Sequence, residues 1–370
     1  MSRRNTFKLS SIALGMGAVF AFGYSASALA DSTYTNYTNS GDLINAAGST
    51  ISVIDGGNGR FQNGSNFNNT TSSLTNLGTI KSDNWFTNGT AASFVTATIT
   101  NSGTIDSANY FQNGASGNND TSIVNNTGGI VSTNYFINGS SGNNDTSTFI
   151  NNGSFSTTNY ILNGSTGTND TSSFTNNGTF TTTSWFQNGT SSDHSAKFEN
   201  FGTLNVSSFR NDGLLVNHGT INGMITGLGT YQQDGGSITL GQPIATTNIE
   251  ILNTNKVSIL PGSLSLNSIY GHSYTLLMGS NITFQGLAAP SDTNIASYFN
   301  LAAFDGMNHF APGTGITFKD TFAGGKLVDV AINFAAAVPE PEVWAMMLLG
   351  LPLIGVAVSR KQANSNLLAA

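Results

Sequence analysis

The sequence contains no cysteine, which excludes disulfide bonds and thiolate metal sites. Charge is also scarce, because Asp, Glu, Lys and Arg make up only 8% of the 370 residues. Residues 31–338 carry 17 acidic and 7 basic side chains, which gives this part of the chain a net charge of −10. Binding of nucleic acid needs clustered Lys and Arg, so we expect no nucleic-acid partner.

A repeat of 25 residues occupies the middle of the chain. One large apolar side chain per unit marks it: Phe61, Phe86, Phe111, Phe136, Ile161 and Phe186. The units lack an apolar stripe at helical spacing, and Asn-Gly or Asn-x-Gly bounds their short runs of Phe, Ile, Val and Thr, which predicts strands and turns. A propeller blade needs about 40 residues or more, whereas a shorter unit suffices for a coil of three strands. The sequence therefore predicts an all-β protein, a parallel β-helix (solenoid) of 25-residue coils.

Stacked coils would align equivalent residues in columns about 4.8 Å apart. Two apolar columns should face the interior: Leu74, Ile99, Val124, Phe149 and Phe174 in one, and Ile80, Ile105, Ile130, Phe155 and Phe180 in the other. Two asparagine columns precede glycines: Asn76, Asn101, Asn126, Asn151 and Asn176 in one, and Asn63, Asn88, Asn113, Asn138, Asn163 and Asn188 in the other. Asparagine tolerates left-handed turn geometry, and stacked amides can hydrogen-bond along a ladder, so we expect both properties here.

The repeat region spans residues 61–230, and residues 31–60 are predicted to be a degenerate coil that caps its N-terminal edge. In residues 231–336 the period fades, although short strand-like runs continue. Two interpretations of this β-rich region stay open: an irregular continuation of the β-helix or a separate terminal β-domain.

The N-terminus has the parts of a signal peptide over residues 1–30. Arg3, Arg4 and Lys8 precede an apolar segment, and Ala28 and Ala30 form a small-x-small cleavage site, after which the mature chain would begin. The general secretory route is favoured over the twin-arginine route, because the segment around the two arginines matches the twin-arginine signal only in part.

The C-terminus contains three consecutive elements: the tetrapeptide Val338, Pro339, Glu340 and Pro341, an apolar segment over residues 343–358, and the basic pair Arg360 and Lys361. The apolar segment is slightly short for a single transmembrane helix, which needs roughly 20 residues, and the basic pair favours a cytoplasmic C-terminus. This arrangement over residues 338–361 resembles the PEP-CTERM sorting signal of Gram-negative bacteria that make exopolysaccharide. The resemblance implies transient anchoring in the inner membrane and cleavage near Pro-Glu-Pro by an exosortase-type enzyme.

Residues 362–370 depart from that family, whose signals usually end soon after the basic pair. A permanent transmembrane anchor without cleavage is therefore the alternative. The Asn-x-Gly-Thr-Ile pattern over residues 61–225 also resembles passenger regions of bacterial autotransporters and filamentous adhesins. Together the resemblances imply an exported protein of the cell surface or of the exopolysaccharide matrix of a biofilm.

An aromatic column is the candidate polysaccharide-binding site. It directly precedes the Phe column of the repeat and consists of Trp85, Tyr110, Tyr135, Tyr160 and Trp185. Because adjacent residues on a strand point to opposite faces, these rings should point outward if the Phe column points inward. Exposed rings would stack on the sugar rings of a matrix polysaccharide. The alternative is a purely structural ladder at a coil corner.

A carboxylate column is the candidate metal site. Asp120, Asp145 and Asp170 share one repeat position, so stacking would place their like charges about 5 Å apart. A calcium ion would relieve this repulsion with oxygen ligands. The interpretation that we prefer is a solvated turn in which each Asp forms an Asx-turn.

Catalysis is not indicated by the remaining residues. The histidines show no metal-ligand spacing: His194, His218, His272 and His309. A polysaccharide lyase or hydrolase on a β-helix is the alternative function, but it needs acidic and basic residues on one face, and the repeats contain few bases. We therefore expect a non-catalytic secreted structural or adhesive protein without a cofactor, with an inert spacer as a further possibility.

Overall fold

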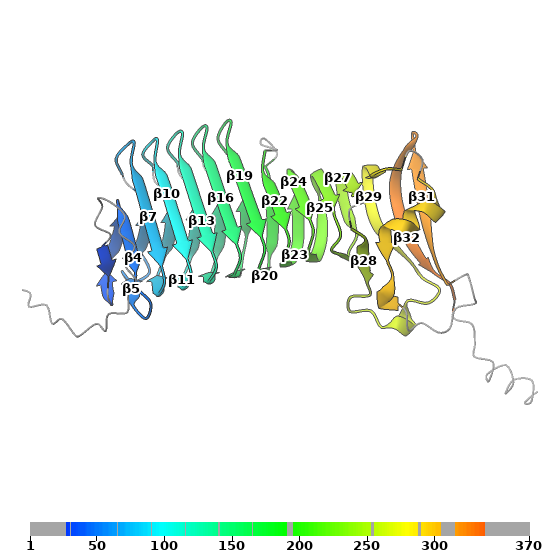
Figure 1. Cartoon of the computed structure of the whole chain (residues 1–370), viewed down its shortest axis with the longest axis horizontal. Coiled ribbons are helices and arrows are strands. Elements are labelled where there is room, and N and C mark those ends of the chain that lie inside the picture. Colours follow the sequence, from blue (N-terminus) through cyan, green and yellow to red (C-terminus); the bar gives the residue numbers. More distant parts are fainter. Residues whose placement is uncertain are drawn as a thin grey trace, which may run out of the picture.

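The computed structural model describes residues 27–29 and 31–336, apart from residues 65, 90, 115, 140, 165, 191–194, 253–254, 288–289 and 305–314. These residues wind into a parallel β-helix whose coils follow one another along one axis (Figure 1). Each regular coil contributes one strand to each of three parallel sheets, here called faces A, B and C. The prediction of an all-β solenoid is confirmed.

The three faces are built from equivalent strands of successive coils. Face A contains β1 (Ser27–Leu29), β4 (Asp42–Asn45), β7 (Thr71–Asn76), β10 (Thr96–Asn101), β13 (Thr121–Asn126), β16 (Thr146–Asn151), β19 (Thr171–Asn176), β22 (Lys197–Asn200) and β24 (Leu214–Asn217). Face B contains β2 (Ser32–Tyr34), β5 (Thr50–Val53), β8 (Thr79–Ser82), β11 (Thr104–Ser107), β14 (Gly129–Ser132), β17 (Ser154–Thr157) and β20 (Thr179–Thr182). Face C contains β3 (Asn36–Asn39), β6 (Arg60–Asn63), β9 (Trp85–Asn88), β12 (Tyr110–Asn113), β15 (Tyr135–Asn138), β18 (Ile161–Asn163) and β21 (Trp185–Asn188).

The interior contains the apolar columns that the repeat predicts. The register pairs Leu74 with Ile99 on face A, Ile80 with Ile105 on face B and Phe61 with Phe86 on face C, and it continues unbroken through the regular coils. These side chains are at most 1% exposed. The first three rings of the Phe column stack, with the centroids of Phe61 and Phe86 4.7 Å apart and those of Phe86 and Phe111 5.0 Å apart. No single coil encloses this core, so its stability depends on the neighbouring coils.

Both asparagine columns form buried amide ladders. On face A, Asn76 Nδ2 donates to Asn101 Oδ1 (2.6 Å), and on face C, Asn88 Nδ2 donates to Asn113 Oδ1 (2.8 Å). The first ladder continues through Asn217 to Gln233, and the second ends at Asn211. The expected left-handed geometry is absent from these columns. It occurs instead in the loops after face C, at Asn69, Phe94, Asn119, Asn144 and Asn169.

The parallel coils continue beyond the regular repeat, but they become shorter and lose the boundaries between strands. β23 (Thr203–Asn211) crosses from face B to face C, and β25 (Thr220–Gln233) crosses all three faces. Five further strands extend the parallel stack: β26 (Ser237–Thr239), β27 (Ile244–Ile251), β28 (Val257–Leu260), β29 (Ser273–Phe284) and β30 (Phe299–Asn300). Of these, β29 pairs in parallel with β27 and also forms a second, antiparallel pairing.

An antiparallel segment covers the C-terminal end of the described coils (Figure 1). β32 (Lys326–Phe334) pairs antiparallel with β29 on one side and with β31 (Ile316–Ala323) on the other. Short helices lie in the connections: η1 (Leu266–Ser268), α1 (Asp292–Ile295), η2 (Ala296–Tyr298) and η3 (Ala302–Phe304). Residues 231–336 are therefore an irregular continuation of the β-helix that ends in an antiparallel cap.

Candidate functional site

A groove runs along face C beside the loops that lead from face C to face A. These loops project from one edge of the coils, at the top of Figure 1. Side chains of face C form the floor of the groove, and loop residues such as Ser116, Ser141 and Thr166 form one wall. Its volume is about 450 Å³, and it extends over successive coils from Arg60 to Leu162.

The aromatic column lies on this outward side of face C, as the alternation along the strands predicts. Trp85 and Tyr110 line the groove, and the other three rings continue the column along the sheet. Successive ring centroids are 5.6, 6.3, 6.2 and 4.1 Å apart, so the five rings form a continuous ladder. Burial raises the pKa of Tyr110 and of Tyr160 to about 12, so both phenols stay neutral hydrogen-bond donors at physiological pH.

The groove is almost free of charge. Arg60 is the only charged residue among the described residues that line it, and no carboxylate lines it. The guanidinium of Arg60 lies 4.4 Å from the ring centroid of Trp85, which is a cation–π contact at the N-terminal end of the ladder. The other lining side chains are neutral: Gln62, Thr87 and Gln112 offer hydrogen-bonding groups, whereas Ile137 and Leu162 are apolar.

The carboxylate column lies at the base of the loops, and its interpretation as solvated turns is wrong. Asp120, Asp145 and Asp170 are only 2–3% exposed. Asp145 Oδ1 accepts a hydrogen bond from the backbone N–H of Asp120 (2.7 Å), and Asp170 Oδ1 accepts one from the N–H of Asp145 (2.8 Å). Each carboxylate thus ties its coil to the preceding coil.

A glycine three residues before each aspartate makes room for this arrangement. A Cβ atom on Gly142 would overlap Asp145 Oδ2 and the carbonyl oxygen of Gly117 in the preceding loop. The two earlier units have Phe67 and Ala92 at the glycine position, and there the aspartate is replaced by Thr or Val. Glycine and aspartate therefore occur together for a steric reason.

The predicted calcium site has no geometric support among the described residues. No group of three or more His, Asp or Glu side chains in the described part of the chain could hold a metal ion. The Oδ1 atoms of the column accept hydrogen bonds from backbone N–H groups, and Oδ2 of Asp120 is buried without a described partner. Burial raises the pKa of Asp120 to about 6. The hydrogen bond from the Val95 N–H lowers this pKa, and the nearby charge of Asp145 raises it.

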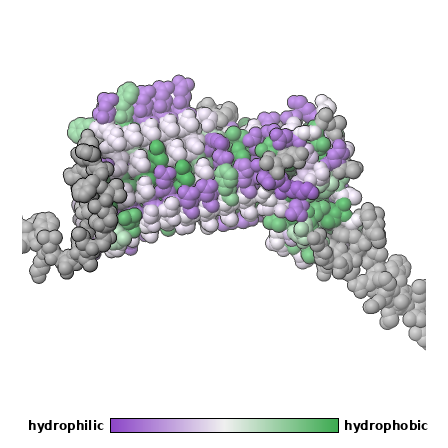
Figure 2. Space-filling model, viewed as in Figure 1, coloured by the Kyte–Doolittle hydropathy of each residue, from purple (hydrophilic) through white to green (hydrophobic). Residues whose placement is uncertain are grey.

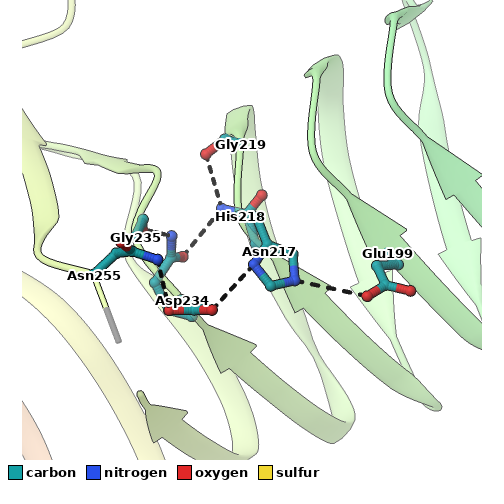
Figure 3. A network of polar contacts seen from close by, with 8 residues as sticks. Glu199, Asn217, His218, Gly219, Asp234, Gly235 and Asn255 are labelled. Atoms are coloured by element: carbon teal, nitrogen blue, oxygen red, sulfur yellow. Dashed lines mark hydrogen bonds and ion pairs between the residues drawn. The ribbon is translucent and has the colours of Figure 1, made fainter. Parts of the chain in front are cut away.

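A polar network around His218 was missed from the sequence (Figure 3). His218 Nδ1 lies 3.3 Å from Asp234 Oδ2, and its Nε2 lies 3.7 Å from Glu199 Oε1. The imidazole also stacks on Phe201, with centroids 4.4 Å apart. The carboxylates lie on opposite sides of the ring, so they link three successive coils and do not converge on a metal or a substrate. Glu199, His218 and Asp234 lie in coils shorter than 25 residues, so the constant period of the repeat did not predict that they are neighbours.

The predicted targeting segments lie largely outside the described residues. Ala28 belongs to β1, which pairs with β4, whereas Ala30 and the sorting residues at 338–341, 360 and 361 are not described. Within the described part of the chain, no helix is long and apolar enough to cross a membrane. The predicted apolar segment over residues 343–358 is not in that part.

The chain matches no family model, and comparisons with curated proteins and with solved structures also gave no match.

Proposed function

We propose that this protein is an exported, non-catalytic solenoid that binds polysaccharide at the cell surface or in the extracellular matrix. The aromatic ladder beside the groove on face C is the observation that carries the proposal. Aromatic rings provide flat apolar surfaces with polar edges, and such rings are enriched where one side of a ligand is apolar and the other is wet. A pyranose ring has this character.

The shape and charge of the groove support binding without cleavage. The groove is open along its length and presents uncharged groups from successive coils, polar at Gln62, Thr87 and Gln112 and apolar at Ile137 and Leu162, which suits a polymeric ligand. Hydrolysis of a glycosidic bond normally uses a pair of carboxyl groups on either side of that bond. The described lining of the groove contains no carboxyl group, so a lyase or hydrolase is the weaker hypothesis.

Delivery to the outside rests on the two terminal signals. We infer that the signal peptide directs export and that the Pro339-Glu340-Pro341 motif directs sorting by an exosortase-type enzyme after transient anchoring in the inner membrane. The structural or adhesive role in a biofilm matrix follows from this address together with the groove. Permanent anchoring by the apolar C-terminal segment is the alternative to cleavage.

The test is retention of the full-length chain on polysaccharide extracted from the producing cells. Replacing all five rings of the ladder with serine should weaken retention while the far-UV circular dichroism spectrum stays that of the folded solenoid. The melting temperature should fall only through the loss of the half-buried Tyr110 and Tyr160. The matched control replaces Leu77 and Val131 with serine, because both are exposed apolar residues away from face C (45% and 41% exposed). A folded five-ring variant that is retained as well as wild type would leave the protein as a spacer.

A further inference from the structure

Exposure along the aromatic ladder alternates from coil to coil. Trp85, Tyr135 and Trp185 are 40%, 37% and 41% exposed, whereas Tyr110 and Tyr160 between them are partly buried. The register places each ring opposite the equivalent ring of the next coil, except at Tyr160, which lies just before β18. Since adjacent coils are about 4.8 Å apart, the well-exposed rings recur roughly every 9.6 Å.

This alternation matches one class of polysaccharide. In an extended β-linked chain, each sugar is turned over relative to its neighbours, so the same ring face recurs at every second sugar. A helical α-linked chain curves away from a straight row and cannot stay in register with it. We propose that face C binds an extended, neutral, β-linked glycan parallel to the solenoid axis, with one sugar per coil and every second sugar stacked on an exposed ring. This inference rests on the proposed function and specifies its ligand.

The polar groups beside the ladder agree with a neutral ligand. The repeat position two residues after the aromatic column holds Gln62, Thr87 and Gln112 in the first three coils of the groove and the apolar Ile137 and Leu162 in the next two. The loop residues Ser116 and Ser141 line the same groove. Amides and hydroxyls both donate and accept hydrogen bonds, as sugar hydroxyls do. A polyanionic glycan would meet a single guanidinium in the described lining and would be repelled by a region with a net charge of −10.

The regular coils also give the ladder the straightness that such a ligand requires. The strands of face C pair in register from β6 to β21 without a bulge. Face A has no comparable row of rings, because the outward positions of β7, β10, β13, β16 and β19 hold Thr, Ser, Ile and Asn. Its strands lie toward the viewer in Figure 1, and the space-filling view from the same side shows a mostly pale surface edged by mainly hydrophilic loops (Figure 2). Face C, and not face A, therefore carries the binding surface.

The experiment measures binding of the full-length chain to cello-oligosaccharides of two to six sugars by isothermal titration calorimetry. Affinity should rise mainly with each second sugar added, because each pair of sugars reaches one more exposed ring. Replacing Trp85, Tyr135 and Trp185 with alanine should raise the Kd for cellohexaose at least about tenfold, which corresponds to 1.4 kcal/mol. The matched control, Tyr110→Phe with Tyr160→Phe, keeps both half-buried rings and should bind within about twofold of wild type.

Three outcomes would overturn the inference. Tighter binding of amylose or of polygalacturonate than of cellohexaose would reject the β-linked neutral class. An even rise of affinity with every sugar, or a larger loss in the Tyr110 and Tyr160 control than in the triple variant, would reject the two-coil register. Each of these results leaves the proposed function intact if the chain still binds the producing cells' polysaccharide, whereas failure to bind any polysaccharide rejects both.

Discussion

Replacing Asn126 with alanine tests whether the buried amide ladder of face A stabilises the solenoid. Asn126 Oδ1 accepts a hydrogen bond from Asn101 Nδ2 (2.7 Å), and its Nδ2 donates to Asn151 Oδ1 (2.8 Å) and to the carbonyl oxygen of Ser154 (3.1 Å). All three asparagines are fully buried, so water cannot replace the missing groups without entering the core. With a fourth, longer bond from Nδ2 to the carbonyl oxygen of Gly128 (3.3 Å), the substitution removes four hydrogen bonds from one place.

The expected loss follows from the partners that remain. Asn151 Oδ1 loses the only donor that the described residues offer it, and an orphaned buried acceptor costs about 1–3 kcal/mol. Asn101 Nδ2 keeps its bond to the carbonyl oxygen of Gly129 (3.1 Å), so its loss is smaller. With about 0.5–1.5 kcal/mol each for the weakened Asn101 and Ser154 groups, the free energy of unfolding should fall by about 2–6 kcal/mol.

The matched control is Asn125→Ala, one residue earlier on the same strand. Asn125 points outward from β13, so its replacement should change stability by no more than about 0.5 kcal/mol. Denaturant unfolding of the full-length chain, followed by far-UV circular dichroism, compares the two midpoints. Equal midpoints for the two variants would refute the reasoning, because the apolar columns alone would then hold the coils together.

Three further predictions test other parts of the molecule. The raised pKa of Asp120 makes the folded state bind more protons than the unfolded state between roughly pH 4 and pH 6, so stability should fall as pH rises through this window. In thermal melts at a series of pH values, Asp120→Asn should reduce this fall, and an unchanged pH dependence would contradict the prediction. Gly142→Ala should lower the free energy of unfolding by about 1–3 kcal/mol through overlap with Asp145 and the preceding loop. Gly129→Ala, whose Cβ would come no closer than 3.5 Å to Ser154 Oγ, should be neutral or slightly stabilising in the same denaturant unfolding, and equal effects would reject the steric argument. Replacing Pro339, Glu340 and Pro341 with alanine should leave an uncut precursor in the membrane fraction on an immunoblot, and intact C-terminal peptides in the secreted wild-type protein would count against cleavage.

The regular coils could be predicted because their period is constant. From Phe61 to Phe186 each equivalent residue returns after 25 positions, so stacking and alternation alone assign the core columns and the outward ladder. The aromatic rings point outward for the same reason, since a strand allows only two directions. Alternating exposure within the ladder could not be predicted, because it depends on how neighbouring rings tilt over one another.

The C-terminal coils and the aspartate column show where the pattern stops being informative. Asn200, Asn217 and Gln233 continue the face A ladder, but they are separated by 17 and 16 residues, so a search for a fixed period passes over them. The signal that remains is local, an amide residue two positions before glycine. The burial of Asp145 was missed because a turn residue was assumed to face solvent, although its pairing with Gly142 indicated close packing.

The asparagine ladder of face C affects how this protein ages chemically. Six of its asparagines precede glycine, and Asn-Gly is the sequence most prone to deamidation, in which the glycine nitrogen attacks the asparagine side chain to form a succinimide. Here the N–H of Gly114 is bonded to the carbonyl oxygen of Asn88 (2.9 Å), while the Asn113 amide is held inside the coil by Asn138 (2.7 Å). Nucleophile and target are both restrained, so a folded coil should resist a reaction that an unfolded one undergoes readily. Succinimide and isoaspartate at these sites would then record which coils have opened during the lifetime of the protein.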